Sequence, residues 1–108
     1  MTYDLIIPEK MFSIHGHRAH ELYQMCIDEL KTEYRALLVL LTTSKNLSES
    51  RLKLHNMLGT ARIMYHDTLC RKIEMVQKNL KSGKQVINSH ELRWIENEIK
   101  NHIDPQHI

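Results

Sequence analysis

Apolar side chains recur every three or four positions along most of this chain, which is the spacing of residues on one face of an α-helix. Four stretches have this spacing, at about residues 17–42, 48–65, 68–81 and 89–102. Strands would need apolar and polar residues in alternation, and no useful length of the sequence has that pattern. The spacing therefore predicts four amphipathic helices and no sheet.

Each predicted helix carries an apolar stripe that can pack against its neighbours. In the first helix the stripe is Leu22, Cys26, Leu30, Tyr34, Leu37 and Leu41. In the second it is Leu54, Met57, Leu58, Ala61, Met64 and Tyr65. The third and fourth stripes are Leu69, Ile73, Val76, Leu80 and then Leu92, Ile95, Ile99. Residues that cap or stop helices stand at the expected ends: Ser48, Asp67 or Thr68, Gly83, Asn88 with Glu91, and Asp104-Pro105.

Four amphipathic helices joined by short connections predict an all-α fold, an antiparallel up-down four-helix bundle. The lead from Pro8 to Ile14 adds a short N-terminal helical cap, in which Phe12 and Ile14 are expected to cover the core. No internal repeat or interdomain linker interrupts residues 1–108, so the sequence predicts a single domain. A bundle by itself says nothing about function.

Charge and composition remove several classes of protein. Fifteen Lys and Arg against thirteen Asp and Glu give a formal net charge of +2, too balanced for a typical nucleic-acid-binding domain. The longest apolar run, Ala36 to Leu41, is far shorter than the ~20 residues that span a bilayer, so no membrane insertion is expected. The two cysteines, Cys26 and Cys70, make no disulfide framework, and we expect thiols in the cytoplasm.

His55 stands beside the apolar stripe of the second predicted helix, on a ridge formed by residues 55, 59, 62 and 66. This ridge should border solvent. Gly59 lies one turn after His55, although glycine inside a helix costs roughly 0.5–1 kcal/mol relative to alanine. Either a neighbouring helix crowds this position, or the glycine carries no packing role, or a partner molecule approaches the backbone here.

The segment His55-Asn56-Met57-Leu58-Gly59-Thr60-Ala61 resembles the H-x-L-K-G-S-A signature of histidine-containing phosphotransfer (HPt) domains of bacterial phosphorelays. Downstream, Leu69-Cys70-Arg71-Lys72-Ile73-Glu74 resembles the L-C-x-x-L-E stretch on the next helix of that family. The likeness covers about residues 17–102 and is specific over 55–74.

The resemblance implies that His55 accepts a phosphoryl group from a receiver-domain aspartate and passes it to another. The phosphorylated atom would be Nε2 of a neutral imidazole, the form in which an ordinary histidine mostly exists at pH 7. Such a protein is a phosphoryl carrier without the ATP site of a kinase. It needs no cofactor of its own, because the partner receiver domain supplies Mg²⁺. A cytoplasmic monomer that docks on receiver domains is expected.

The sequence also departs from the family. Leu58 stands where the family has a lysine, and Tyr65 and His66 stand where it has glycine and alanine. Arg62 or Arg51 is expected to take over part of the positive charge, because arginine binds phosphate bidentately, although Arg51 equally suits a solvated helix start.

Docking on the partner should use apolar residues around the imidazole. Leu52 and Leu58 flank His55, and we expect at least one of them to be partly exposed. Gly59 would then give the partner clearance, so that a larger residue there hinders its approach.

Three other readings stay open. The chain would be a non-transferring helical adaptor for a receiver or kinase if His55 only docks. It would be a nucleic-acid-binding helical domain if Arg51, Lys53, Arg62, Arg71 and Lys72 contact the phosphates, which a steep salt dependence of DNA affinity would support. The spacing of His15, His17 and His20 resembles a metal site, but structural zinc usually needs four ligands, and helix-end residues are the simpler interpretation.

Overall fold

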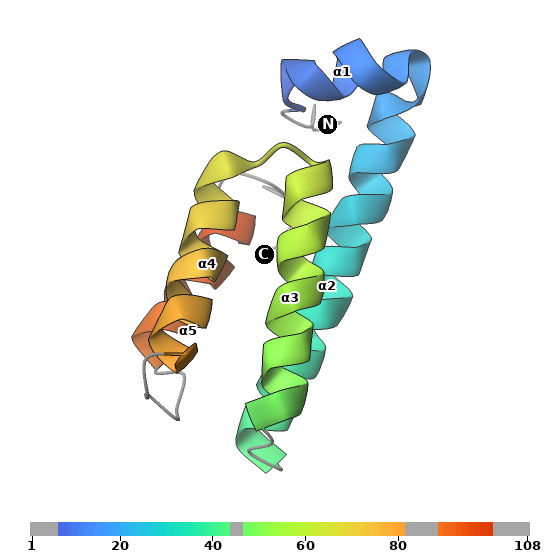
Figure 1. Ribbon diagram of the computed structural model, residues 1–108. Helices are drawn as coiled ribbons and strands as arrows, with labels where there is room; N and C mark the ends of the chain where they lie inside the picture. Colours follow the sequence, from blue (N-terminus) through green and yellow to red (C-terminus); the bar gives the residue numbers. More distant parts are fainter. Residues whose placement is uncertain (1–6, 44–46, 82–88, 101–108) are drawn as a thin grey trace.

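All regular structure in the described part of the chain is helical (Figure 1). The computed structural model describes residues 7–43, 47–81 and 89–100, and every structural statement below concerns those residues. The elements are α1 (Glu9–His15), a 3₁₀ turn η1 (Gly16–Arg18), α2 (Ala19–Thr43), α3 (Leu47–Ile63), α4 (Asp67–Lys81) and α5 (Ser89–Glu98). The predicted all-α class is confirmed, and the four predicted helices correspond in order to α2, α3, α4 and α5.

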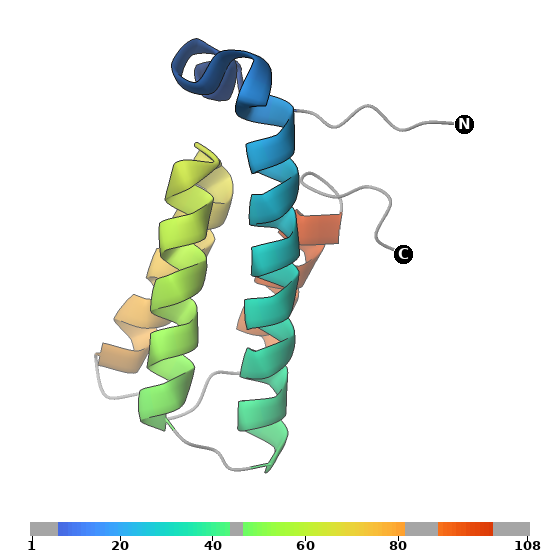
Figure 2. The ribbon, with the colours of Figure 1, turned by 90° about the vertical axis from the view of Figure 1, so that its right-hand side faces the viewer.

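Four of these helices pack against each other. α2 and α3 lie side by side along most of their length, and both views of the ribbon show this pairing (Figures 1 and 2). α4 packs against α3, and α5 packs against α4. α1 crosses the end of the bundle where α2 begins, above the last turn of α3 (Figures 1 and 2).

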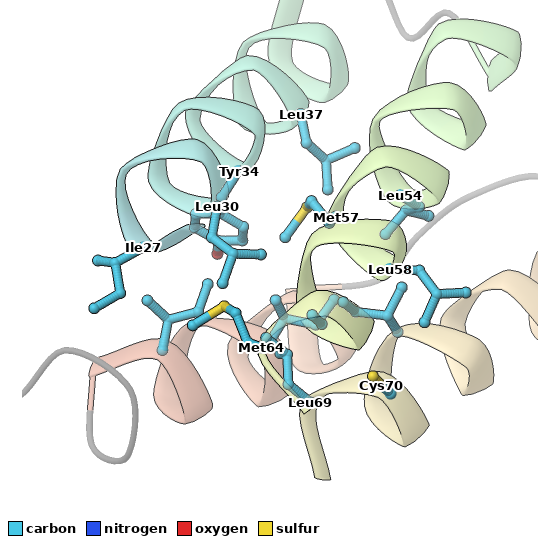
Figure 3. Packing of buried hydrophobic residues seen from close by; sticks show 14 of the residues in the cluster. Ile27, Leu30, Tyr34, Leu37, Leu54, Met57, Leu58, Met64, Leu69 and Cys70 are labelled. Carbon is cyan, nitrogen blue, oxygen red and sulfur yellow. The ribbon is translucent and has the colours of Figure 1, made fainter. Parts of the chain in front are cut away.

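Figure 3 shows the core, in which apolar side chains from α2, α3 and α4 meet. Most of the predicted stripe residues of α3, α4 and α5 are buried there. In α2 the buried face is turned slightly from the prediction: Tyr23 and Ile27 are fully buried, whereas Leu22 and Cys26 are partly buried. Full burial of one such aliphatic side chain contributes about 1.5–3 kcal/mol, so the core holds the rotation of each helix firmly.

The predicted N-terminal cap exists, but the prediction that Phe12 and Ile14 cover the core is wrong. Met11 is the buried residue of α1, and Phe12 and Ile14 are half exposed. A seven-residue helix buries only one narrow side. The turn at Gly16, which has a φ of 57°, sets which side that is.

The helix-end predictions differ from the structure by a few residues. α3 begins at Leu47, so Ser48 lies in its first turn and is not the N-cap; α4 begins at Asp67, whose carboxylate is well placed near the positive end of the helix dipole. Gly83, Asn88 and Asp104-Pro105 lie outside the described residues.

α3 ends at Ile63, two residues earlier than predicted, in a Schellman motif. The amide of Tyr65 donates to the carbonyl of Arg62 at 3.0 Å, and the amide of His66 donates to the carbonyl of Ala61 at 3.1 Å. Tyr65 adopts a φ of 56°, the left-handed conformation that this motif requires and that glycine adopts most easily. In the family that the sequence resembles, a second glycine, beyond the one matched by Gly59, stands at this position.

We expect Tyr65→Gly to be more stable than Tyr65→Ala by about 1 kcal/mol. Both variants lose the same ring, including its contact with the Lys10 ammonium, which lies 5.5 Å from the ring centroid. They differ only in the cost of the left-handed backbone, which falls on alanine and not on glycine. Urea denaturation of the two variants measures the difference, and an alanine variant of equal or greater stability would contradict the strain.

Candidate functional site

His55 lies in the middle of α3 and is exposed to solvent, as the sequence predicts. Leu54 beside it and Met57 two residues on are fully buried. Successive residues of a helix differ by about 100°, so a histidine next to the buried stripe points along its border with solvent.

Polar contacts on both edges of α3 hold this orientation. On the α2 edge, the carboxylate of Glu33 accepts a hydrogen bond from the Asn56 amide at 3.3 Å and pairs with the Lys53 ammonium at 3.7 Å. On the α4 edge, Nη2 of Arg51 donates to the main-chain carbonyl of Leu80 at 3.3 Å. The core fixes the rotation of α3, and these contacts join its two edges to α2 and α4.

Gly59 is exposed one turn after His55, and the structure excludes crowding by a neighbouring helix. A Cβ built at Gly59 meets no atom within 4 Å beyond its own helix turns and chain neighbours. Its backbone is ordinary helix, so no special φ requires glycine either. Nothing within the described chain therefore explains this glycine, which leaves open space beside His55.

We expect Gly59→Ala to raise the free energy of unfolding by about 0.5–1 kcal/mol, because alanine is the better helix former and fits the space without contact. Gly16→Ala is the matched control. It also enters open space, but its φ of 57° is costly for a residue with a Cβ, and it should lose about 1 kcal/mol or more. Urea denaturation measures both; a destabilised Gly59→Ala would reveal a packing role that the structure does not show.

Two exposed aliphatic side chains flank Gly59 on the same face of α3. Leu52 is 49% exposed and Ile63 is 56% exposed. They lie seven residues before and four residues after Gly59, so all three share one side of the helix. The exposure of Leu52 confirms that at least one leucine beside His55 is accessible.

The predicted docking role of Leu58 is wrong. Its side chain is only 4% exposed and belongs to the core, so it is not available for docking or for phosphate. α4 packs on this edge of α3 and widens the buried stripe.

Ile63 was missed by the sequence reasoning. The signal that could have found it is its position off the core stripe, one turn beyond Gly59 on the same face.

Arginines border this face at two places. Arg51 lies one turn before His55 and Arg62 lies two turns after it, and both are exposed. Burial raises the pKa of the Cys70 thiol on α4, and the nearby Arg62 guanidinium partly opposes that shift. Arg62 is therefore near enough to Cys70 for its charge to act on the thiol. We call the residues Arg51, Leu52, His55, Gly59, Arg62 and Ile63 the His55 face.

His66 does not continue this face, because α3 has already ended. It lies half-buried in the turn, and its carbonyl accepts the Cys70 amide at 3.1 Å as α4 begins. The predicted ridge is therefore shorter by one residue.

The five cations of the nucleic-acid reading do not share one free face. Lys53 pairs with Glu33 on the α2 edge, and Lys72 pairs with Glu98 of α5 at 3.4 Å. Arg51 is bound to the Leu80 carbonyl. These contacts point the charges to three different neighbours, which argues against a continuous basic surface.

The hypothesis of a metal site is also unsupported in the described part of the chain. Among these residues, no three His, Cys, Asp or Glu side chains come together as a group that could hold an ion. His15, His17 and His20 stand around the start of α2 without forming such a group. None of the described helices has the length and apolar character that crossing a membrane requires.

Comparison with known protein families, with curated proteins and with solved structures finds no match for this chain.

Proposed function

We propose that this protein is a histidine phosphotransfer intermediate, in which His55 accepts a phosphoryl group from a receiver-domain aspartate and donates it to another. The observation that carries the proposal is an exposed imidazole fixed in mid-helix beside a glycine that the fold itself does not need. The left-handed Tyr65, at the position of the family's glycine, adds a backbone likeness to the sequence likeness. The proposal includes the arrangement of the four helices, an antiparallel up-down bundle.

The transfer needs little catalysis by this chain beyond the nucleophile itself. Nε2 of the neutral imidazole attacks the phosphorus of the aspartyl phosphate, the P–N bond forms, and the P–O bond breaks to release the aspartate carboxylate. The ring keeps its proton on Nδ1 and can later lose it to water. Because positioning and charge neutralisation dominate phosphoryl transfer, the contribution of α3 is to hold the nucleophile still.

The partner completes the site. In this proposal the receiver domain brings Mg²⁺ and a lysine, and the chain acts as a cytoplasmic monomer without a cofactor of its own. The apolar side chains of Leu52 and Ile63 would bury against the receiver, and Gly59 would let its loops approach the helix backbone. Arg51 and Arg62 border this surface with positive charge, which suits the acidic phosphorylation site of a receiver.

The test is transfer of radioactive phosphate from a phosphorylated receiver domain to the purified chain. We expect label that is lost in acid and kept in alkali, as for a P–N bond, and mass spectrometry should map it to the peptide that carries His55. Because the cognate receiver is not identified, a panel of receivers phosphorylated by acetyl phosphate serves as donors. Label on another residue would overturn the assignment.

The second candidate is a non-transferring adaptor that docks on a receiver or kinase through the same His55 face. Leu58 favours it, since the position of the family's lysine carries no charge here and is buried. The adaptor hypothesis predicts receiver binding, measured by calorimetry, that is unchanged in His55→Gln. It also predicts that neither the wild-type chain nor this variant takes up label. Binding with label on His55 excludes it.

A further inference from the structure

We propose that Arg51 exchanges partners when His55 is phosphorylated: it leaves the main-chain carbonyl of Leu80 and binds the phosphoryl group. The phosphorylation state of α3 is thereby transmitted to the last turn of α4. This inference rests on the proposed function of His55, and it adds to that function a residue that positions the phosphate and a structural response to it.

The hydrogen bond that joins Arg51 to α4 is weak. Its Nη2 donates to the Leu80 carbonyl at 3.3 Å, longer than the usual 2.9–3.0 Å of an N–H···O bond. The acceptor is an uncharged carbonyl at the end of α4, one of those that have no partner within the helix. A stronger acceptor within reach would draw the guanidinium away.

Phosphorylated His55 would place that acceptor within reach. Arg51 and His55 are four residues apart on α3, so their Cβ atoms are neighbours at about 5–6 Å. Side chains of a helix lean toward its N-terminus, so the imidazole of His55 lies over the turn that carries Arg51. Arg62 lies seven residues, about two turns, after His55 and thus in the direction opposite to Arg51.

The difference in charge between the Leu80 carbonyl and the phosphoryl group decides which of them Arg51 binds. A phosphoryl group carries about −1.5 to −2 charge near neutral pH and offers three acceptor oxygens. Hydrogen bonds between a guanidinium and a phosphate are about twice as strong as neutral ones, and the fork of an arginine can make two of them at once. Since Leu58 is buried and uncharged, Arg51 is the cation of the His55 face that is best placed to hold the phosphate.

The consequence falls on α4. Leu80 is 2% exposed and packs in the core, while its carbonyl receives the Arg51 contact at the helix end. Losing that donor leaves the last turn of α4 with one fewer tie to α3. The end of α4 therefore differs between the phosphorylated and unphosphorylated protein, even though His55 belongs to another helix.

Phosphoramidate tests this without any partner protein. It transfers its phosphoryl group to a ring nitrogen of exposed histidines, and the signal of His55 is the one that His55→Gln lacks. In each transfer the P–N bond of the reagent breaks, and ammonia leaves with the proton that the imidazole gives up. NMR of the labelled full chain then reads the Leu80 carbonyl ¹³C shift and the ³¹P titration of the phosphate. We expect phosphorylation to move the Leu80 shift to its value in unphosphorylated Arg51→Gln. We also expect the phosphate of wild type to titrate about half a pH unit below that of Arg51→Gln, since an adjacent cation favours the dianion.

Arg62→Gln is the matched control, because it removes the other arginine of the His55 face. Its phosphate should titrate as in wild type. If His55 takes up no phosphate, the proposed function itself fails. If His55 is phosphorylated while Leu80 and the titration do not respond to Arg51, only the exchange of partners is overturned. The comparison of wild-type protein before and after phosphorylation decides the Leu80 response even where Arg51→Gln folds poorly.

Discussion

Replacing His55 by glutamine is expected to reduce acid-labile labelling from a phosphorylated receiver to background. The carboxamide nitrogen of glutamine has its lone pair delocalised and cannot act as the nucleophile, whereas its size and helix propensity suit α3. Because His55 is exposed and the core beneath it is untouched, the free energy of unfolding should change by no more than about 0.5 kcal/mol. Labelling and urea denaturation measure the two effects.

His20→Gln is the matched control for this prediction. It makes the same chemical change at another exposed histidine, near the start of α2, and should leave labelling at the wild-type level. If His55→Gln keeps its label, or if His20→Gln loses it, then His55 is not the phosphoacceptor.

Introducing the lysine that the HPt signature carries at the position of Leu58 is expected to destabilise this protein. Leu58→Lys should lower the free energy of unfolding by about 2–4 kcal/mol, since it removes a buried leucine and brings an ammonium into the edge of the core. The long stem of lysine can carry its charge toward solvent, which keeps the loss within that range. For a domain of this size the melting temperature should fall by roughly 10–20 °C.

Leu52→Lys is the matched control, because it makes the same change on the same helix at a side chain that is 49% exposed. Its stability should stay within about 0.5 kcal/mol of wild type. Thermal unfolding followed by circular dichroism separates the two variants. Equal stability of Leu58→Lys and Leu52→Lys would mean that Leu58 is not held in the core.

The burial of Leu58 also determines which cations could lie near a phosphoryl group on His55. The buried Leu58 leaves the His55 face without a lysine one turn from the imidazole, and Arg51 and Arg62 are the cations that border it. Of these, Arg51 is the nearer along the helix, and a long hydrogen bond joins it to the Leu80 carbonyl of α4. In the proposed function, His55 would therefore take the nucleophile position of the HPt signature while the positive charge comes from a different residue.

How far the sequence alone predicts the candidate site depends on the kind of feature. The spacing of apolar residues correctly placed His55 on the exposed border of its helix, because the rotation between neighbouring residues is a local property of the helix. It also identified Gly59 as unusual, because the cost of glycine in a helix needs no tertiary information. The same geometry predicted that at least one of Leu52 and Leu58 is partly exposed, and Leu52 confirms this.

Tertiary packing decided the residues at the margin of the stripe. Leu58 lies on the edge of α3 that faces α4, so its burial depends on a neighbouring helix and not on its own position in the repeat. The hydrogen bond from Arg51 to Leu80 joins residues 29 positions apart, which no local pattern encodes. Whether Ile63 is exposed depended on where α3 ends and on what packs around that end.

Four amphipathic helices, a histidine at the edge of one of them and a glycine one turn away can be predicted without coordinates, since they follow from the helical repeat and residue chemistry. Packing between the helices established that nothing in the described chain crowds Gly59, that Leu58 is buried and Ile63 exposed, and that Tyr65 takes a left-handed turn. The reason is physical: periodicity fixes directions around one helix axis, whereas burial and strain depend on the other helices that pack against it.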